Sequence, residues 1–171
     1  TATANSPQDI NATNRIYMFH LVAPATGANN VAITLSSAAS IRGRSTSYTG
    51  AKQTGQPDAN ATNTGAGVTT LTTSTTTTVD NCWVAGIARD DTDVMTAGSG
   101  TTERNIGGNA VFGMYDSGGA VTPAGNKDLI VNCASSGGML MITVSIAPLA
   151  ASGPSNLKSL NTNLKANIKS I

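Results

Sequence analysis

Charged and aromatic residues are scarce in this sequence of 171 residues: 11% are charged and 4% are aromatic. An average soluble domain has roughly 25% charged residues. The formal net charge is only +1, and nucleic-acid binding needs a basic surface that releases counterions, so no nucleic-acid partner is predicted. Arg42 and Arg44 are close together, but an exposed strand face explains them better than a binding patch does. No apolar run approaches the ~20 residues of a membrane-spanning helix, and no secretory signal is visible.

Residues that form common catalytic and metal sites are also few. Two cysteines and one histidine are too few for a zinc site made of these residue types alone. The sequence has no phosphate-binding loop, no dinucleotide fingerprint and no Gly-x-Ser-x-Gly elbow. Glu103 is the only glutamate, and a surface ion pair with Arg104 explains it better than glycoside cleavage, which needs two acids. We therefore expect a protein that is not an enzyme and has no cofactor.

The polar residues leave two candidates for a special role. Asp90, Asp91 and Asp93 form the only acidic cluster, and their oxygens are candidate Ca²⁺ ligands. The cluster lacks the glycine and the distant glutamate of a calcium loop, so a solvated loop explains it better. His20 lies in an apolar segment, where a core or hydrogen-bonded histidine is the better interpretation.

Cys82 and Cys133 each lie in a predicted strand. They form one disulfide if the protein works in an oxidising, extracellular compartment. The alternative is two separately buried thiols, which behave as small hydrophobic side chains. The sequence leaves both possibilities open.

Small polar residues dominate nearly every window, and threonine favours strands because its branched Cβ suits a pleated sheet. Apolar residues alternate within short segments that are separated by turn residues. The predicted strands are residues 15–23, 31–36, 41–49, 68–79, 81–89, 110–115, 127–133 and 138–147. This pattern predicts an all-β fold, an antiparallel, jelly-roll-like β-sandwich. The predicted divisions are an irregular N-terminal segment (1–14), the sandwich domain (15–150) and a C-terminal tail (151–171).

Several of these segments have specific predicted positions. Residues 15–23 and 31–36 are expected to form a hairpin, and residues 50–67 and 90–108 to form long loops. The threonine-rich segment 68–79 is predicted to be a solvent-facing or edge strand. Trp83 is expected to be buried on a central strand, and the most apolar segment, 138–147, to lie in the core.

The tail has a pattern of its own. Residues 156–160 (NLKSL) recur as residues 167–171 (NIKSI), 11 positions later. Its apolar residues are spaced as on one face of a helix, although four asparagines favour an extended segment. Either form predicts that the tail docks on another surface. The predicted assembly residues are Leu157, Leu160, Leu164, Ile168 and Ile171.

Three stretches together are similar to segments of known proteins. Residues 17–36 (YMFHLVAPATGANNVAITLS) are similar to a Y-x-L-x-x-P-x-T-G-x-x-x-V-x-V-T hairpin, and residues 47–58 (SYTGAKQTGQPD) to an S-[YF]-x-G-x-x-Q-x-x-x-x-D segment. Residues 155–171 are similar to the Asn/Lys/Ile-rich repeats of the same proteins. The combination resembles β-sandwich domains of phage virion and tail-associated proteins and of related bacterial surface proteins. It implies an extracellular or virion location and no catalytic residues.

The chain departs from that resemblance at its start. Such domains have further strands before the hairpin, whereas only 14 irregular residues precede it here. We therefore predict an incomplete sheet with an unpaired edge, which another chain completes by adding a strand. Residues 1–14 or the tail are the candidate donated segments in a head-to-tail assembly.

Two functions follow as hypotheses. The first is a structural protein of a virus particle, phage tail or extracellular filament, which assembles with copies of itself or with other virion or filament proteins. The alternative is a carbohydrate- or receptor-binding module that recognises a surface glycan. For the alternative, Tyr48 and Tyr115 are the candidate exposed aromatics, because Trp83 and Phe112 are expected to be buried.

Overall fold

The computed structural model describes residues 2–4, 6–11, 14–105 and 111–150, and every regular element in this part of the chain is a β-strand. All strand pairings are antiparallel. The predicted all-β antiparallel fold is therefore confirmed. The strands are β1 (Gln8–Asn11), β2 (Asn14–Ile16), β3 (Ala59–Thr76), β4 (Trp83–Asp90), β5 (Met95–Ala97), β6 (Thr102–Asn105), β7 (Phe112–Asp116) and β8 (Asn126–Ile146).

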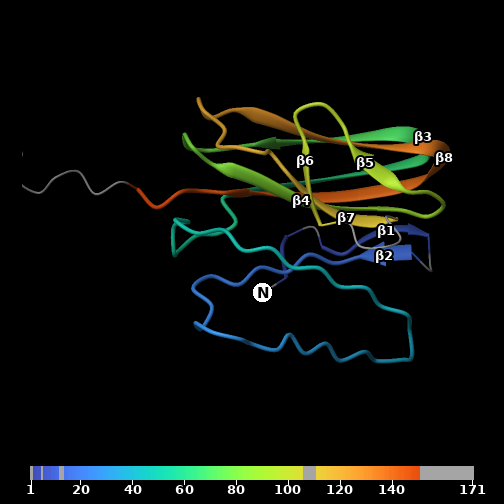
Figure 1. Cartoon of the computed structure of the whole chain (residues 1–171), viewed down its shortest axis with the longest axis horizontal. Helices are drawn as coiled ribbons and strands as arrows, with labels where there is room; N and C mark the ends of the chain where they lie inside the picture. Colours follow the sequence, from blue (N-terminus) through green and yellow to red (C-terminus); the bar gives the residue numbers. More distant parts are fainter. Residues whose placement is uncertain (1, 5, 12–13, 106–110, 151–171) are drawn as a thin grey trace, which may run out of the picture.

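A sheet of six strands forms the body of the molecule (Figure 1). Its order is β3-β8-β4-β7-β6, and β5 pairs separately with β8. The two long strands, β3 and β8, pair along their whole length, but the register shifts between Ala66 and Thr70. The first half of β3 pairs with the second half of β8, where Ala59 faces Ser145. The second half of β3 pairs with the first half of β8, where Thr76 faces Asn126.

The two halves of the β3–β8 pair pack against each other. Thr75, from the second half of β3, forms a 2.6 Å hydrogen bond with Thr143, from the second half of β8. Leu71, Leu129 and Val131 on one half share a buried cluster with Met139 and Met141 on the other. The remaining buried members of this cluster are Val84, Ala88, Met95 and Tyr115.

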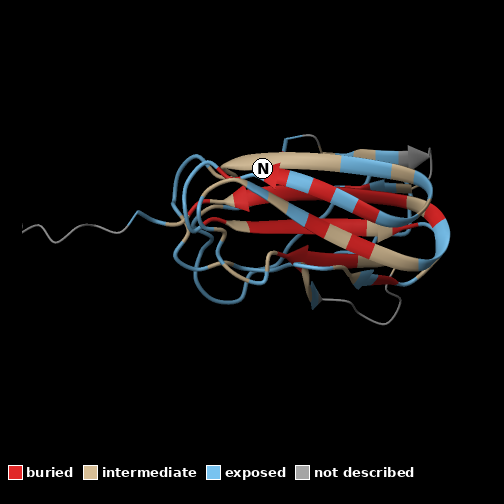
Figure 2. Cartoon of the chain, turned by 90° about the horizontal axis from the view of Figure 1, so that it is seen from above, coloured by how far each residue is buried: buried red, intermediate tan, exposed pale blue. Residues whose placement is uncertain are grey.

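A second apolar cluster lies on the opposite face of the second half of β8. Leu140 and Ile142 point to this face, because successive side chains of a strand alternate. They are covered by Ile16, the last residue of β2, and by Met18, two residues further on. The central strands are therefore buried on both faces, as the red segments in Figure 2 show.

The threonine-rich segment is the second half of β3, and β3 lies at the edge of the sheet as predicted. Alternate residues of this half differ sharply in exposure: Leu71, Thr73 and Thr75 are buried, and the residues between them are exposed. The segment is thus an edge strand with one solvent-facing side. Its other side lies over the core.

The predicted hairpin of residues 15–23 and 31–36 is wrong for this structure. Strand β2 ends at Ile16, and residues 31–36 and 41–49 contain no strand. Residues 22–43, which we call the arm, instead loop away from the sheets (Figure 1). An alternating apolar segment becomes a strand only where a neighbouring backbone edge can pair with it, and no such edge lies beside the arm in the described part of the chain.

Other boundaries also differ from prediction. The expected loop 50–67 contains the start of β3, and the expected loop 90–108 contains β5 and β6. The expected irregular segment 1–14 contains β1. Polar stretches of this kind form strands when a long neighbour such as β8 supplies backbone partners, which local composition does not reveal. Residues 151–171 lie outside the described residues, and the jelly-roll-like arrangement and the domain division remain predictions.

Candidate functional site

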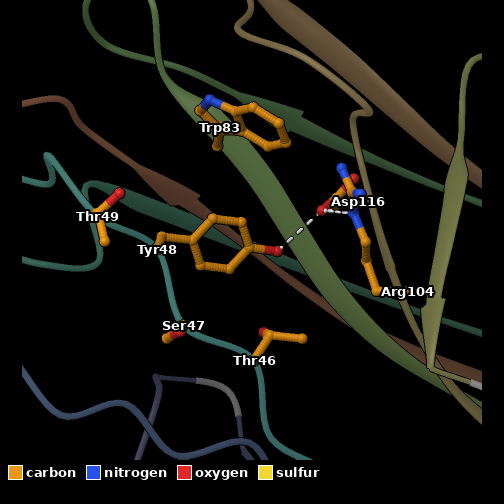
Figure 3. Close-up of a pocket in the computed structure, with 7 residues that line it drawn as sticks. All are labelled: Thr46, Ser47, Tyr48, Thr49, Trp83, Arg104 and Asp116. Atoms are coloured by element: carbon orange, nitrogen blue, oxygen red, sulfur yellow. Dashed lines mark hydrogen bonds and ion pairs between the residues drawn. The ribbon is translucent and has the colours of Figure 1, made fainter.

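A pocket of about 460 Å³ opens where the chain returns from the arm to the main sheet (Figure 3). One wall is the segment 46–49, which follows the arm. The other walls come from the start of β4, from β6 and from the end of β7. The lining residues are Thr46, Ser47, Tyr48, Thr49, Trp83, Arg104 and Asp116.

Asp116 holds the walls together. Its side chain is 1% exposed, and it accepts hydrogen bonds from Arg104 Nε (2.5 Å), from the Tyr48 hydroxyl (3.1 Å) and from the Gly118 backbone amide (2.8 Å). A buried carboxylate is tolerated only when it is paired in this way. Burial and the neighbouring carboxylate raise the pKa of Tyr48 to about 12. The hydrogen bond to Asp116 also raises the pKa of Arg104.

Two aromatic rings and a guanidinium group form the floor of the pocket. The Tyr48 and Trp83 ring centroids are 5.9 Å apart with a tilt of 51°. Arg104 Cζ lies 5.7 Å from the Trp83 ring centroid, within the range of a cation–π interaction. Aromatic surfaces beside hydroxyl groups and a half-exposed arginine suit a small polar ligand. Both carboxylate oxygens of Asp116 already accept hydrogen bonds from these neighbours.

The structure changes the assignment of the candidate aromatics. Tyr48 lines the pocket, but Tyr115 is 1% exposed in the core and cannot contact a sugar. Trp83 does begin a central strand, as predicted, yet it and Phe112 are half-buried instead of fully buried. Arg104 pairs with Asp116, and the predicted pair with Glu103 is wrong.

The Arg104–Asp116 pair was missed by sequence reasoning. The two residues are 12 positions apart, in strands that the sequence assigned to a loop and to a turn. Their proximity depends on the β6–β7 register, in which Thr102 faces Asp116. No local pattern in the sequence specifies that register.

The acidic cluster organises a loop. Asp90 is buried and accepts hydrogen bonds from the backbone amides of Thr92 (2.8 Å) and Asp93 (2.6 Å). Asp91 accepts one from the Gly138 amide (2.7 Å). The Asp93 carboxylate accepts a hydrogen bond from the Ser135 amide (3.0 Å). The described residues contain no group of three or more His, Cys, Asp or Glu side chains placed to hold a metal ion.

The two cysteines are free thiols in the structure, which is the second of the two alternatives. Cys82 is fully buried, with Sγ 3.7 Å from an Asp58 carboxylate oxygen. Cys133 is half-buried, and burial together with the neighbouring Asp90 raises the pKa of its thiol. His20 is half-buried, and its Nδ1 lies 3.4 Å from the Thr3 hydroxyl, as expected of a hydrogen-bonded histidine.

A second candidate surface lies beside the arm. Tyr17, Phe19 and Leu21 point outward from the extended segment after β2 and are 49%, 65% and 74% exposed. We call this row the stripe. The Tyr17 and Phe19 rings stack with centroids 6.2 Å apart. The stripe thus presents ordered apolar surface to solvent, on the side opposite to the buried residues Ile16 and Met18.

The arm presents a matching set of exposed apolar side chains. Val31, Ile33, Leu35 and Ile41 are 83%, 57%, 43% and 53% exposed. The arm has a preformed turn near its start, where the Asn29 side chain donates hydrogen bonds to the carbonyls of residues 25 (2.9 Å) and 27 (3.1 Å). It is therefore locally ordered at the turn and apolar beyond it.

Both ends of the arm are attached to the body. Before it, the Met18 amide donates to the Ser6 hydroxyl (2.9 Å), and the Met18 carbonyl accepts from the Thr3 amide (2.9 Å). After it, Arg44 Nε donates to the Phe112 carbonyl (3.3 Å), and Tyr48 is held by Asp116. The pocket is thus also the anchor that fixes where the arm returns to the sheet.

The described part of the chain has no helix, and so none that is long and apolar enough to cross a membrane. The predicted assembly residues of the tail lie outside the described residues. Comparisons with known protein families, with curated proteins and with solved structures found no match to this chain.

Proposed function

We propose that this chain is a non-enzymatic structural subunit of a virus particle, phage tail or extracellular filament, which assembles with copies of itself or with other proteins of the same particle. The observation that supports this proposal is the apolar surface formed by the stripe and the arm. Six large apolar side chains, Tyr17, Phe19, Leu21, Val31, Ile33 and Leu35, are between 43% and 83% exposed. Monomeric proteins seldom expose such surface without using it for an interaction.

The energetic argument favours association. Fully burying one large apolar side chain contributes about 1.5–3 kcal/mol. These six side chains are 43–83% exposed, so covering each contributes only part of that value. Together they contribute an amount within the range of the cost of association, about 4–15 kcal/mol. The low charge of the chain, 11% of its residues, adds little repulsion between copies.

The test is the mass of the natively purified chain, measured by size-exclusion chromatography with light scattering. We expect a mass of several chains. A second sample that ends at Gly153 tests whether the tail takes part, and a loss of mass would support the predicted docking of residues 151–171. A full chain with the mass of one chain at every accessible concentration would contradict the proposed function.

The pocket supports a second candidate function, binding of a surface glycan. The rings of Trp83 and Tyr48 offer apolar faces to a sugar. Beside them, the Nε of Arg104 donates a hydrogen bond to Asp116. Trp83 is the only tryptophan, so a sugar that enters the pocket should change the fluorescence of the chain. Titration with a panel of neutral and acidic oligosaccharides checks this, with Arg104→Gln as the variant that should lose binding. No fluorescence change with any member would contradict the glycan hypothesis.

A further inference from the structure

The stripe and the arm are matched in spacing. Tyr17, Phe19 and Leu21 are each two residues apart, and so are Val31, Ile33 and Leu35. In an extended chain, residues two apart lie on one side about 6.5 Å from each other. The two rows are therefore of equal length and can place three side chains against three when the strands run antiparallel.

Neither row is covered by the described residues of one copy. The exposed fraction of every side chain in the two rows is at least 43%. The arm is attached to the body on both sides, at Met18 and at Arg44, and between these points it loops away from the sheets (Figure 1). Within the described residues, the arm of a copy does not cover its own stripe, and a second copy can supply a partner for each row.

The composition of this region selects the kind of partner. Residues 16–41 contain no Asp, Glu, Lys or Arg, so the region has no charge that would attract a nucleic acid, an anionic membrane or a charged protein. Interfaces between identical copies are the more apolar ones, with little charge in their centres. Each copy of this chain also supplies both rows, which is the requirement for a reciprocal contact between two copies.

We propose that the arm of one copy docks on the stripe of a second copy, with Val31, Ile33 and Leu35 packed against Tyr17, Phe19 and Leu21. This inference rests on the proposed assembly function and names the contact that produces it. The docked arm segment adds a strand beside the extended segment that follows β2. Its backbone groups then form hydrogen bonds across the contact.

Cysteine cross-linking tests the contact directly. Both samples contain Cys133→Ser, so that only the buried Cys82 remains of the native thiols. A Phe19→Cys chain is mixed with an Ile33→Cys chain and oxidised. We expect a disulfide-linked pair of chains that forms about tenfold or more faster than with the control pair, because docking raises the effective concentration of the two thiols. The control mixes Ile33→Cys with Val94→Cys, whose native side chain is 51% exposed outside both rows.

A chain with both Phe19→Cys and Ile33→Cys distinguishes docking between two chains from docking within one chain. Cross-links between chains agree with the proposal. A cross-link that forms only within single chains would overturn it, because the arm would then cover its own stripe.

Charge placed in either row gives a second, independent readout. Ile33→Asp in the arm and Phe19→Asp in the stripe should each reduce the measured mass to that of one chain, whereas Val94→Asp should leave the mass unchanged. These side chains are exposed, so the variants should still fold. An assembled chain whose mass resists both substitutions would overturn the docking and leave the proposed function standing. A wild-type chain that is monomeric would overturn both.

Discussion

Two apolar regions of this chain have opposite fates. In the second half of β8, Leu140 and Ile142 are completely buried, with β3 and β4 paired on either side and further layers on both faces. In the arm, Val31 and Ile33 are 83% and 57% exposed and have no strand beside them. Both regions consist of strand-forming side chains, so composition does not separate them.

The difference lies in what surrounds each region. Residues of β8 pair with partners as far away as Ala59 and Trp83, which face Ser145 and Ile146. The arm begins with Pro24 and a turn at residues 25–29, which the Asn29 side chain closes, so its start is ordered by local contacts. An apolar segment is buried only where distant parts of the chain supply both its backbone partners and its covering layers.

The largest expected effect compares one leucine from each region. Leu140→Ala removes a side chain that is 0% exposed and should lower the free energy of unfolding by about 2–5 kcal/mol. Leu35→Ala in the arm should change it by less than about 0.5 kcal/mol when the chain is measured as a monomer. Urea unfolding at low protein concentration checks both values. Equal losses would show that the arm is packed in the free chain.

A smaller effect concerns the carboxylate that holds β3 to β8. Asp58 accepts hydrogen bonds from the hydroxyls of Thr78 (2.5 Å) and Ser145 (3.2 Å). Partial burial works to raise the pKa of Asp58, but these hydrogen bonds outweigh it and hold the pKa below its ordinary value. The ionised form therefore stabilises the fold fully above pH ~4, and this contribution is lost as the pH falls through the lowered pKa of the folded state.

Asp58→Asn should cost about 1.5–3 kcal/mol at neutral pH, because charged hydrogen bonds are lost from a half-buried site. The stability of the variant should also decline less than that of the wild type between pH 4 and pH 2. Unfolding curves across that pH range measure both effects. Asp128→Asn, at an exposed position, is the matched control, and an equal loss in the control would contradict a specific role for Asp58.

Two glycines sharpen the same comparison. A Cβ at Gly86 would lie 2.9 Å from Thr143 Cγ2 and 3.0 Å from the Ile142 carbonyl oxygen. Gly86→Ala should therefore cost about 1–3 kcal/mol through overpacking. Gly43, in the arm, has nothing within 4 Å of the same position, and Gly43→Ala should be neutral or slightly stabilising. Thermal unfolding of the two variants measures both effects. A larger loss of stability in Gly43→Ala than in Gly86→Ala would contradict the comparison.

The smallest effect distinguishes two tyrosines. The Tyr115 hydroxyl is buried without a hydrogen-bond partner among the described residues, so Tyr115→Phe should leave stability unchanged or raise it slightly. Tyr48→Phe removes the hydrogen bond to Asp116 and should cost about 1 kcal/mol. Unfolding free energies measured side by side provide the check. A clear loss in Tyr115→Phe would reveal a partner for its hydroxyl.

Much of the strand content could be predicted from local pattern. The segment 81–89 corresponds to β4, and the segments 127–133 and 138–147 both lie in β8. The threonine-rich segment was correctly placed at an edge, because hydroxyl side chains tolerate water on one side of a strand. These predictions succeeded since each depended on residue types within one segment.

The candidate site was only partly predictable. Tyr48 was recognised as an available aromatic, but Arg104 was assigned to a polar loop and Asp116 to a turn. They meet through the β6–β7 pairing, and no local pattern in the sequence specifies the register of that pairing. The error over residues 15–36 has a similar origin, since an alternating pattern does not specify which segment a strand pairs with.

The sequence by itself determined the all-β class, the scarcity of charge and the most apolar strand, because these follow from side-chain shape and composition. Only the tertiary structure decided that the two halves of β3 and β8 face each other, that Asp116 is buried beneath Arg104 and Tyr48, and that the arm remains exposed. Burial is a property of contacts between distant segments. The same kind of apolar row therefore becomes core in β8 and open surface in the arm.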